Sequence, residues 1–364
     1  MPAETNKSVI MVGPLSGPIS GQMAAFRESV AAIPDAVVVD AAFVSPVRVL
    51  RYWGSLALAF GRTRGPVYIT TSRSQKGFWL RDLPVFAAAA ALRRPVINHL
   101  HGNDFLDFRR RTRRLTKALI DHFYSRITIA IVPSRSLAGQ YAAYSSTSVV
   151  VVPNFFDSAV LQSSTVKCDS GPINILYFSN FITSKGYTVV CDAVRLIRKR
   201  GVPVNLTLCG AVLSDPDMSA AETTQYLQRV ENEGVGMVRP AVFGPEKVEV
   251  LTRAHVMVLP TRYPTEAAPI SLIEGLAAGC YVISSDQGSI ADLLKGFEAS
   301  IVDATSEEVA DAICAYASRS DRAVIPAYNR NRAIQLYSPV SYQNRIREVL
   351  NEFVDTAERR STQL

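Results

Sequence analysis

The segment at residues 256–285, VMVLPTRYPTEAAPISLIEGLAAGCYVISS, constrains the fold of this chain more than any other. It begins and ends with a short apolar run of strand length, VMVL and YVIS. Pro260, Pro264 and Pro269 prevent a helix before Ile270. The last of them suits a first helical position, and residues 270–278 have helix-forming composition. Gly279 suits the left-handed residue that ends a helix. We therefore predict strand, loop, helix and strand, as in a parallel α/β sheet.

Two glutamates lie on either side of the start of this predicted helix, eight positions apart. Glu266 is in the loop and Glu274 is within the first turns. A helix that begins beside the carboxyl end of a parallel strand offers backbone N–H groups to an anion such as a diphosphate. Glu266 could then accept hydrogen bonds from hydroxyls next to the phosphate, and Glu274 from a ribose diol. Surface salt bridges are the alternative interpretation of both glutamates.

The rest of the chain alternates predicted strands and helices, which indicates parallel sheets. With 364 residues and 48% hydrophobic content, the chain is long enough for two domains with separate cores. The polar stretch at 163–172 is the best linker candidate. Besides a first apolar run before Gly13, the strand candidates lie at 37–39, 67–70, 96–99, 127–132 and 149–152, then at 173–178, 204–208, 241–243, 256–259 and 281–284.

Composition favours a soluble protein of a reducing compartment. The apolar run near the N-terminus is too short for a signal peptide. The longest apolar stretch, at 85–92, is far below the ~18 residues that span a bilayer. The five cysteines are odd in number and form no C-x-x-C pair, which favours a reduced cytosolic protein without structural zinc.

Several segments, in the same order, resemble the retaining glycosyltransferases of the GT-B fold that carry an E-x7-E signature. This group includes glycogen synthases and bacterial polysaccharide and lipopolysaccharide sugar transferases. The similarity covers about residues 9–300. The segments that carry it are VGPLSGPISGQ, HLHGNDF, VPSRSLAGQY, VVPNFFD, ILYFSNFITSKGY, LTLCG with VFGPEK, and PTRYPTEAAPISLIEGLAAGCYVI.

The resemblance implies two Rossmann-like domains that face each other across a cleft. We expect an acceptor-side domain at 1–165, a nucleotide-sugar domain at 166–335, and a helix with a polar tail at 336–364 that crosses back to the first domain. It also implies metal-independent transfer, with retention, of a hexose-type sugar from a UDP- or GDP-linked donor to a glycan acceptor, with no further cofactor. The donor site is expected to include Glu266, Glu274, Lys185, Asn180, Arg262, Gly210, Ala267, Ala268, Pro269 and Ile270.

Lys185 matches the basic residue that binds the leaving diphosphate in this family. The family usually has an arginine five positions earlier, and Asn180 stands there instead. Asparagine donates hydrogen bonds but carries no charge. Arg262, in the loop of Glu266, is our candidate for the missing cation. A solvated surface lysine is the alternative for Lys185.

In the first domain, His101 matches the donor-facing histidine of the family. It shares a strand face with His99, but only Asp104 lies nearby as a further ligand, so we expect no metal site. Gly21 and Gln22 lie where the family has paired glycines next to donor phosphate or acceptor. A buried structural role for His101, and tight turns for the glycines, are the alternatives.

The positive charge of the chain, +7, is concentrated between Phe108 and Arg126. One amphipathic helix there, with Leu115, Leu119 and Phe123 on one face, would suit an anionic membrane surface and a lipid-linked acceptor. We find no nucleic-acid motif, and a solvated basic face remains an alternative. The cations are Arg109, Arg110, Arg111, Arg113, Arg114 and Lys117.

The sequence therefore predicts a glycosyltransferase of bacterial surface polysaccharide synthesis, peripheral on the cytoplasmic face of the membrane. Two other functions stay open. A GT-B sugar-nucleotide epimerase or hydrolase would need an acid/base pair, and a non-catalytic nucleotide-sugar or membrane-binding protein would be consistent with Asn180.

Overall fold

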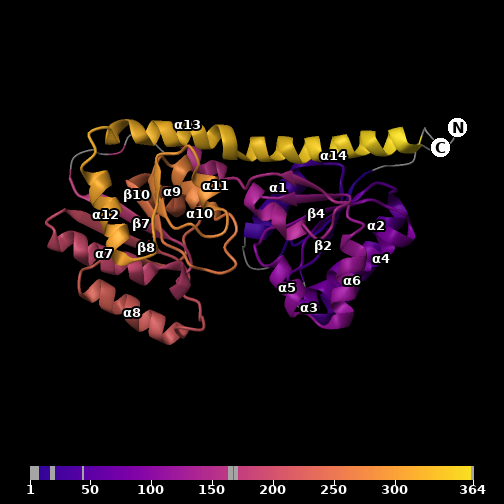
Figure 1. The fold of residues 1–364 in the computed structure, drawn as a ribbon, viewed down its shortest axis with the longest axis horizontal. Helices are drawn as coiled ribbons and strands as arrows, with labels where there is room; N and C mark the ends of the chain where they lie inside the picture. The colour runs from indigo at the N-terminus through magenta and orange to yellow at the C-terminus, as the bar shows by residue number, and fades with distance from the viewer. Residues whose placement is uncertain (1–7, 17–20, 43–44, 163–166, 168–170, 362–364) are drawn as a thin grey trace. The chain divides into compact units, whose positions relative to one another are not determined.

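The computed structural model describes residues 8–16, 21–42, 45–162, 167 and 171–361. The chain divides into two compact units (Figure 1). The first unit consists of Met1–Asn154 with Val340–Leu364, and the second is Phe155–Pro339. The proposed linker at 163–172 lies largely outside the described residues.

The first unit contains a six-stranded parallel sheet in the order β2-β1-β3-β4-β5-β6. The side chains of its central strands are buried on both faces and are mostly apolar, as expected for a parallel sheet covered by helices. The chain order reverses between β1 and β3, where open α/β sheets bind ligands. The strands are β1 Ile10–Gly13, β2 Val37–Asp40, β3 Val67–Thr70, β4 Val96–His99, β5 Ile129–Val132 and β6 Ser148–Val151.

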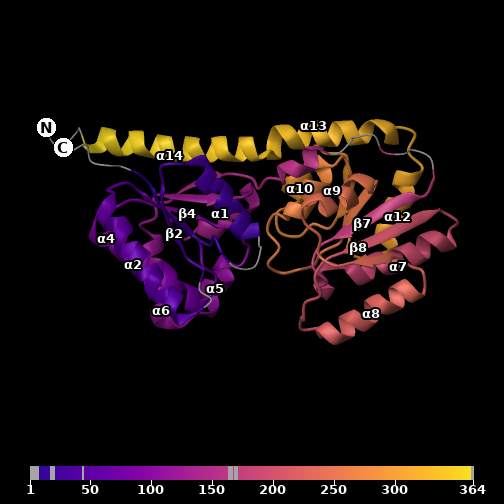
Figure 2. The same ribbon diagram turned by 180° about the vertical axis from the view of Figure 1, so that it is seen from behind.

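Helices connect these strands, and the last helix of the chain joins them. The hydroxyl groups of Tyr342 and Ser29 lie 2.7 Å apart, and Arg347 Nε donates to Ala32 O over 2.9 Å, so α14 packs beside α1 (Figure 2). The elements are α1 Gly21–Ala32, α2 Pro46–Arg62, α3 Gln75–Gly77, the π-helix η1 Phe78–Asp82, α4 Leu83–Ala91, α5 Phe105–Arg111, α6 Arg114–Tyr124, the 3-10 helix η2 Arg135–Tyr141 and α14 Pro339–Ser361.

The second unit contains another six-stranded parallel sheet, ordered β12-β11-β10-β7-β8-β9. Its strands are β7 Ile173–Phe178, β8 Val204–Cys209, β9 Met237–Arg239, β10 Val256–Leu259, β11 Tyr281–Ser284 and β12 Ala299–Ile301. Its helices are α7 Tyr187–Lys199, α8 Ala220–Asn232, α9 Gly244–Arg253, α10 Ile270–Ala277, α11 Ile290–Leu294, α12 Ser306–Ala317 and α13 Ile325–Tyr337, with 3-10 turns η3 Ser158–Gln162, η4 Thr183–Lys185 and η5 Arg322–Val324.

The segment that anchors the sequence analysis forms β10, a loop, α10 and β11, as predicted. Gly275 lets α10 approach the sheet, because a Cβ there would lie 2.3 Å from Met257 Sδ. Gly279 has φ +80° and ends the helix as expected. Pro269 is the residue before the helix and not its first residue.

The structure differs from the predicted secondary structure at three places. Residues 241–243 lie between β9 and α9, and the strand is Met237–Arg239, because Pro240 has no N–H with which to continue the ladder. β12, an edge strand with Ile301 43% exposed, was not predicted. The expected polar tail is helical as far as Ser361.

Candidate active site

Lys185 and Glu266 form an ion pair in the second unit, with Nζ 3.0 Å from Oε2. Their side chains are only 15% and 9% exposed, so solvent screens the pair weakly. Lys185 follows β7 and Glu266 follows β10, which pairs with β7. Two residues 81 positions apart thus meet at the carboxyl edge of the sheet.

Backbone contacts hold the loops of both residues. Gly186, which follows Lys185, has φ +82°, and a Cβ there would lie 2.4 Å from Pro260 O. Glycine is therefore needed for this close approach. Arg262 N donates to Ser184 O over 2.6 Å, which ties the loop of Glu266 to the loop of Lys185.

A third loop packs against Glu266 from the other side. Gly288 has φ +64°, and a Cβ on it would lie 2.1 Å from Glu266 O. Ser289 donates to Ala267 O from both its backbone N and its Oγ, over 2.9 and 2.6 Å. The Glu266 loop is therefore fixed between two neighbours.

Asp215 positions the Lys185 loop and was missed by the sequence analysis. Thr183 N donates to Asp215 Oδ2 over 2.5 Å, and Asp217 N and Met218 N donate to Oδ1 over 2.8 and 2.9 Å. Burial acts to raise the pKa of Asp215, but these N–H groups outweigh it and hold the pKa below its usual value. The only signal in the sequence was an aspartate in a turn after β8.

Glu274 lies in α10 and is 6% exposed. Lys247, from α9, places Nζ 2.8 Å from Glu274 Oε1 and 2.7 Å from Asp157 Oδ2. Burial acts to lower the pKa of Lys247, but the two carboxylates outweigh it and raise the pKa, so the ammonium stays charged. The Glu274 carboxylate is thus held in one position by a half-buried cation that the sequence analysis did not identify.

Arg262, the predicted substitute for the missing arginine, lies near Lys185 through its backbone, because its N–H donates to Ser184 O. Arg262 is exposed, and its Nη2 donates to Ala304 O over 2.5 Å. Asn180 is exposed, and its carbonyl accepts a hydrogen bond from Tyr177 Oη over 3.0 Å. A Cβ on Gly210 would lie 1.9 Å from Ser179 O, so the loop of Asn180 packs on this glycine.

The residues at the start of α10 are small or apolar. No side chain caps the helix at Pro269. Ala267 and Pro269 are buried, whereas Ala268 and Ile270 are half-buried. None of these side chains is charged, so the polar groups at this position are the backbone N–H groups of the first turn. Such N–H groups suit an anionic ligand.

In the first unit, His101 follows β4 at the carboxyl edge of the sheet. The residue is half-buried, but its Nε2 is buried and has no hydrogen-bond partner among the described residues. Burial and the charges of Arg73 and Arg81 lower the pKa of His101 to about 3. The imidazole is therefore neutral at neutral pH.

His99 has a structural environment. It is fully buried, and its Nδ1 lies 2.5 Å from Tyr68 Oη. The rings of His99 and His101 lie 4.0 Å apart between centroids. Among the residues that the structure describes, no group of three or more His, Cys, Asp or Glu side chains could hold a metal ion.

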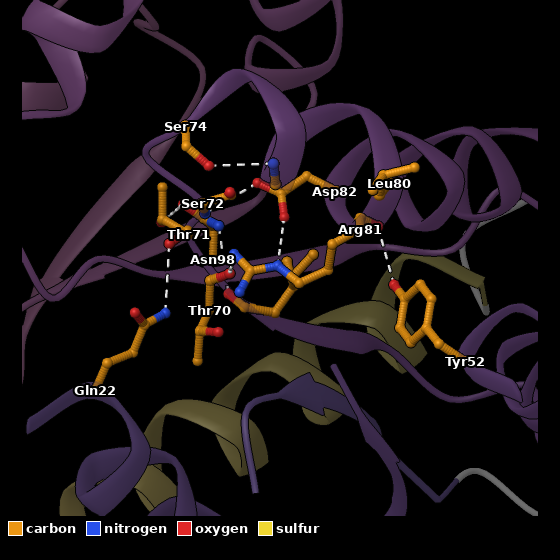
Figure 3. Close-up of polar contacts among 12 residues, drawn as sticks. Gln22, Tyr52, Thr70, Thr71, Ser72, Ser74, Leu80, Arg81, Asp82 and Asn98 are labelled. Atoms are coloured by element: carbon orange, nitrogen blue, oxygen red, sulfur yellow. Dashed lines mark hydrogen bonds and ion pairs between the residues drawn. The ribbon is translucent and has the colours of Figure 1, made fainter. Parts of the chain in front are cut away.

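A buried ion pair supports this edge of the first sheet (Figure 3). Arg81 Nε lies 2.7 Å from Asp82 Oδ1, and Arg81 Nη2 donates to Thr70 O over 2.6 Å. Gln22, next to Gly21 at the start of α1, donates to Thr71 O over 3.4 Å. The structure therefore places Gln22 at the end of β3, although the preceding residues 17–20 lie outside the described part.

The basic segment is two helices, and the expectation of one helix was wrong. Thr112 and Arg113 have extended backbone with ψ of 160° and 151°, which separates α5 from α6. Arg109 donates to Asp121 from Nε and Nη2, over 2.5 and 2.8 Å, and so joins the two helices. The other cations are exposed: Arg110, Arg111, Arg113, Arg114 and Lys117.

The inward face of α6 also differs from the prediction. Thr116, Ile120 and Tyr124 are buried, whereas Leu115 is 64% exposed. Phe123, on the predicted apolar face, is half-buried against Phe86, with ring centroids 6.0 Å apart. Within the described residues, no helix is long and apolar enough to cross a membrane.

Sequence and structure comparisons agree with this geometry. Residues 163–331 match the family described as Glycosyl transferases group 1. No curated protein matches the chain significantly.

The fold is similar to solved structures at low sequence identity. One is HepE of Anabaena in complex with UDP, with 16% identity, a TM-score of 0.71, and coverage of 95% of this chain and 100% of HepE. A glycosyltransferase from Rickettsia africae has 12% identity, a TM-score of 0.73, and coverage of 96% and 99%. Sucrose-phosphate synthase from Thermosynechococcus elongatus has 14% identity, a TM-score of 0.67, and coverage of 96% and 100%.

The match to the family covers β7 to α13, the elements that carry Lys185, Glu266 and Glu274, and both sheets have the GT-B arrangement. Residues 163–331 therefore carry the domain of the group 1 glycosyltransferases, and the chain is a retaining glycosyltransferase of the GT-B fold that transfers a sugar from a nucleotide sugar.

Proposed function

We propose that the chain transfers a hexose-type sugar from a UDP-sugar to a hydroxyl of a lipid-linked glycan, without a metal ion. The observation that carries this proposal is the Lys185–Glu266 pair beside the start of α10. The pair places a cation, and a carboxylate that can accept hydrogen bonds from sugar hydroxyls, beside a helix start at one edge of the sheet. UDP is the favoured nucleotide because HepE has been solved with UDP and with UDP-glucose.

In this proposal the second unit binds the donor. The diphosphate lies at the start of α10, near Ala267, Ala268 and Ile270, and draws the ammonium of Lys185 away from Glu266. Glu266 is then free to accept hydrogen bonds from the sugar hydroxyls. Preorganised cations and N–H groups stabilise the charge that develops on the leaving diphosphate.

Glu274 has a different role in the same donor. Its carboxylate, held by Lys247, accepts hydrogen bonds from the ribose diol. The acceptor hydroxyl attacks from the face on which UDP leaves, and the UDP phosphate takes its proton. No protein nucleophile is needed. Arg262 supplies the second cation, in place of the arginine that is absent at Asn180.

The first unit provides the acceptor side, with His101 and the loop of Gly21 and Gln22 at the edge of its sheet. The exposed cations from Arg110 to Lys117 hold it on the anionic cytoplasmic face of a membrane, where a lipid carrier is presented. Surface polysaccharide synthesis is the process we favour.

Thermal unfolding with a panel of UDP-, GDP-, ADP- and dTDP-sugars tests the donor. A ligand at 100 times its Kd stabilises the folded state by about 2.7 kcal/mol, so one nucleotide should stand out. EDTA should leave the shift unchanged. A panel with no stabilising sugar nucleotide, or a shift that needs a divalent ion, would overturn the proposal.

Turnover then separates a transferase from its alternatives. UDP release that depends on an added acceptor supports transfer. Release to water alone indicates a hydrolase, and donor binding without any turnover indicates a binding protein.

A further inference from the structure

Helix α2 of the first unit is apolar on two opposite faces. Tyr52, Leu56, Ala59 and Phe60 are buried against the unit. The opposite face, here called the α2 face, follows the helical period and contains no charged side chain. It consists of Val47, Leu50, Gly54, Ala57, Leu58 and Gly61.

The α2 face is open. Val47, Leu50 and Leu58 are 58%, 68% and 61% exposed. A Cβ added at Gly54 or Gly61 would meet nothing within 4 Å. A surface helix normally has polar residues opposite its buried face, and contiguous exposed apolar residues mark an interaction surface.

Positive charge lies beside this face. Arg48, Arg51 and Arg62 are exposed along one border of it, and α2 has no acidic residue. Residues 46–126 contain sixteen lysines and arginines against four aspartates, a net charge of +12, although the whole chain carries only +7. One of those aspartates, Asp82, is buried against Arg81. The expected partner is therefore apolar in its interior and anionic on its surface.

The two tryptophans of the chain are both at this surface. Trp53 and Trp79 are 42% and 38% exposed. Trp53 Nε1 donates to Leu80 O over 3.0 Å, and Trp79 Nε1 donates to Thr116 Oγ1 over 3.2 Å. Each indole N–H is thus satisfied by the protein, while part of each ring faces outward. Tryptophan is typical of the boundary between water and lipid.

The same contacts join α2, α4 and α6 into one layer (Figures 1 and 2). Tyr52 Oη donates to Arg81 O over 2.9 Å, which ties α2 to η1, as Figure 3 shows. Arg94 Nη2 donates to Phe60 O over 2.7 Å, so the end of α4 lies beside the end of α2, next to the exposed Leu92. Trp79 connects η1 to α6, where Leu115 is exposed among the cations.

We propose that the α2 face, flanked by Trp53 and Trp79, inserts into the interfacial region of an anionic phospholipid bilayer. This inference rests on the proposed function, in which exposed cations attract the first unit to a membrane. It adds the burial of apolar side chains in the lipid. A second copy of the chain is a poor occupant, because two such surfaces would bring like charges together.

Tryptophan fluorescence tests insertion directly, since both tryptophans report on this surface. The full chain is mixed with phosphatidylcholine vesicles that contain phosphatidylglycerol, with and without brominated acyl chains. Insertion should shift the emission to shorter wavelength, and bromine should quench it. Trp53→Phe and Trp79→Phe, made one at a time, assign the quenching to each ring.

The matched variants replace exposed apolar residues at two places. Leu50→Gln with Leu58→Gln should weaken partitioning to these vesicles by about tenfold or more, because each leucine loses burial in lipid. Leu213→Gln with Val324→Gln, in the second unit, should leave it unchanged. Both double variants should keep the thermal shift given by UDP-sugar, which shows that they are folded.

Each outcome has one meaning. Quenching by bromolipid and loss only in the α2 double variant support the inference. Binding that salt abolishes completely, without quenching, would overturn it and leave attraction by the α5 and α6 cations alone. Self-association that the α2 variant removes, without vesicle binding, would make the α2 face a protein contact. Failure of the UDP-sugar shift in the parent protein would count against the transferase proposal and not against insertion.

Discussion

Lys185 and Glu266 form an ion pair, with Nζ 3.0 Å from Oε2. Lys185 Nζ also lies 5.0 Å from the centre of the Tyr263 ring, in the loop of Glu266. A diphosphate at this position would compete with the carboxylate for the ammonium. Donor binding and release of Glu266 would therefore be coupled.

This coupling predicts opposite effects of Glu266→Gln on affinity and on turnover. The substitution frees Lys185, so UDP should bind at least as tightly as to the parent protein. Turnover should fall roughly 100-fold, the scale for losing one preorganised group. Isothermal calorimetry with UDP and steady-state kinetics measure the two effects. Lys185→Ala is the control and should weaken both, and weaker UDP binding by Glu266→Gln would contradict the coupling.

The Lys247 network predicts a rescue. Lys247→Met leaves the buried carboxylate of Glu274 without its cation, which should cost about 3 kcal/mol of unfolding free energy. Adding Glu274→Gln removes that unpaired charge and should restore much of the stability, but not the affinity for UDP. Urea denaturation and calorimetry measure both. If the double variant is as unstable as Lys247→Met alone, the loss arises from Asp157 or from packing.

Arg262 is proposed to replace the arginine that is absent at Asn180. Arg262→Ala should then raise the activation free energy by about 3 kcal/mol. Its hydrogen bond to Ala304 O is a separate, structural effect, expected to change unfolding free energy by only about 1 kcal/mol. Kinetics and denaturation of the same variant separate the two. Turnover equal to that of the parent protein would leave Lys185 and the helix start as the phosphate-binding groups.

The elements most completely predicted were those bounded by proline and glycine. The unit from β10 to β11 followed from Pro269, Gly279 and two apolar runs. Edge strands were harder, because β9 and β12 are three residues long and partly exposed, with Met237 61% exposed. Their hydrophobic signal is correspondingly weak.

The sequence predicted which side chains would face a ligand, but not the contacts with other residues that hold them in position. Lys247 meets Asp157 and Glu274 from 90 and 27 positions away, and local spacing cannot indicate such contacts. The break at Thr112 also has a distant cause, since Thr112 Oγ1 accepts a hydrogen bond from Gln75 Nε2 over 2.9 Å. Periodicity alone therefore favoured a single helix.

His101 predicts acid sensitivity of the fold. Its pKa is about 3 in the folded chain, against 6.5 for an ordinary histidine, so the unfolded chain binds the additional proton between these values. Unfolding free energy should therefore fall as pH is lowered from 6.5 toward 3. His101→Gln should flatten this dependence in urea denaturation, whereas replacement of the exposed His122 serves as the control. An unchanged slope in His101→Gln would assign the sensitivity to other groups, His99 first.

The two kinds of arginine in the basic segment should respond differently to replacement. Arg109→Gln breaks the paired hydrogen bonds to Asp121, which also accepts from Tyr144 Oη over 2.9 Å, and should destabilise the first unit by about 1–2 kcal/mol. Replacing Arg110, Arg113 and Arg114 together should change stability by less than about 0.5 kcal/mol, because all three are exposed. The triple variant should nevertheless lose the part of vesicle binding that salt screens over about 10 Å at 0.1 M. Denaturation and vesicle sedimentation at low and high salt compare the two, with neutral vesicles as the control. Retention of salt-sensitive binding by the triple variant would place the charge contact elsewhere, with Arg48, Arg51 and Arg62 along α2 as the next residues to replace.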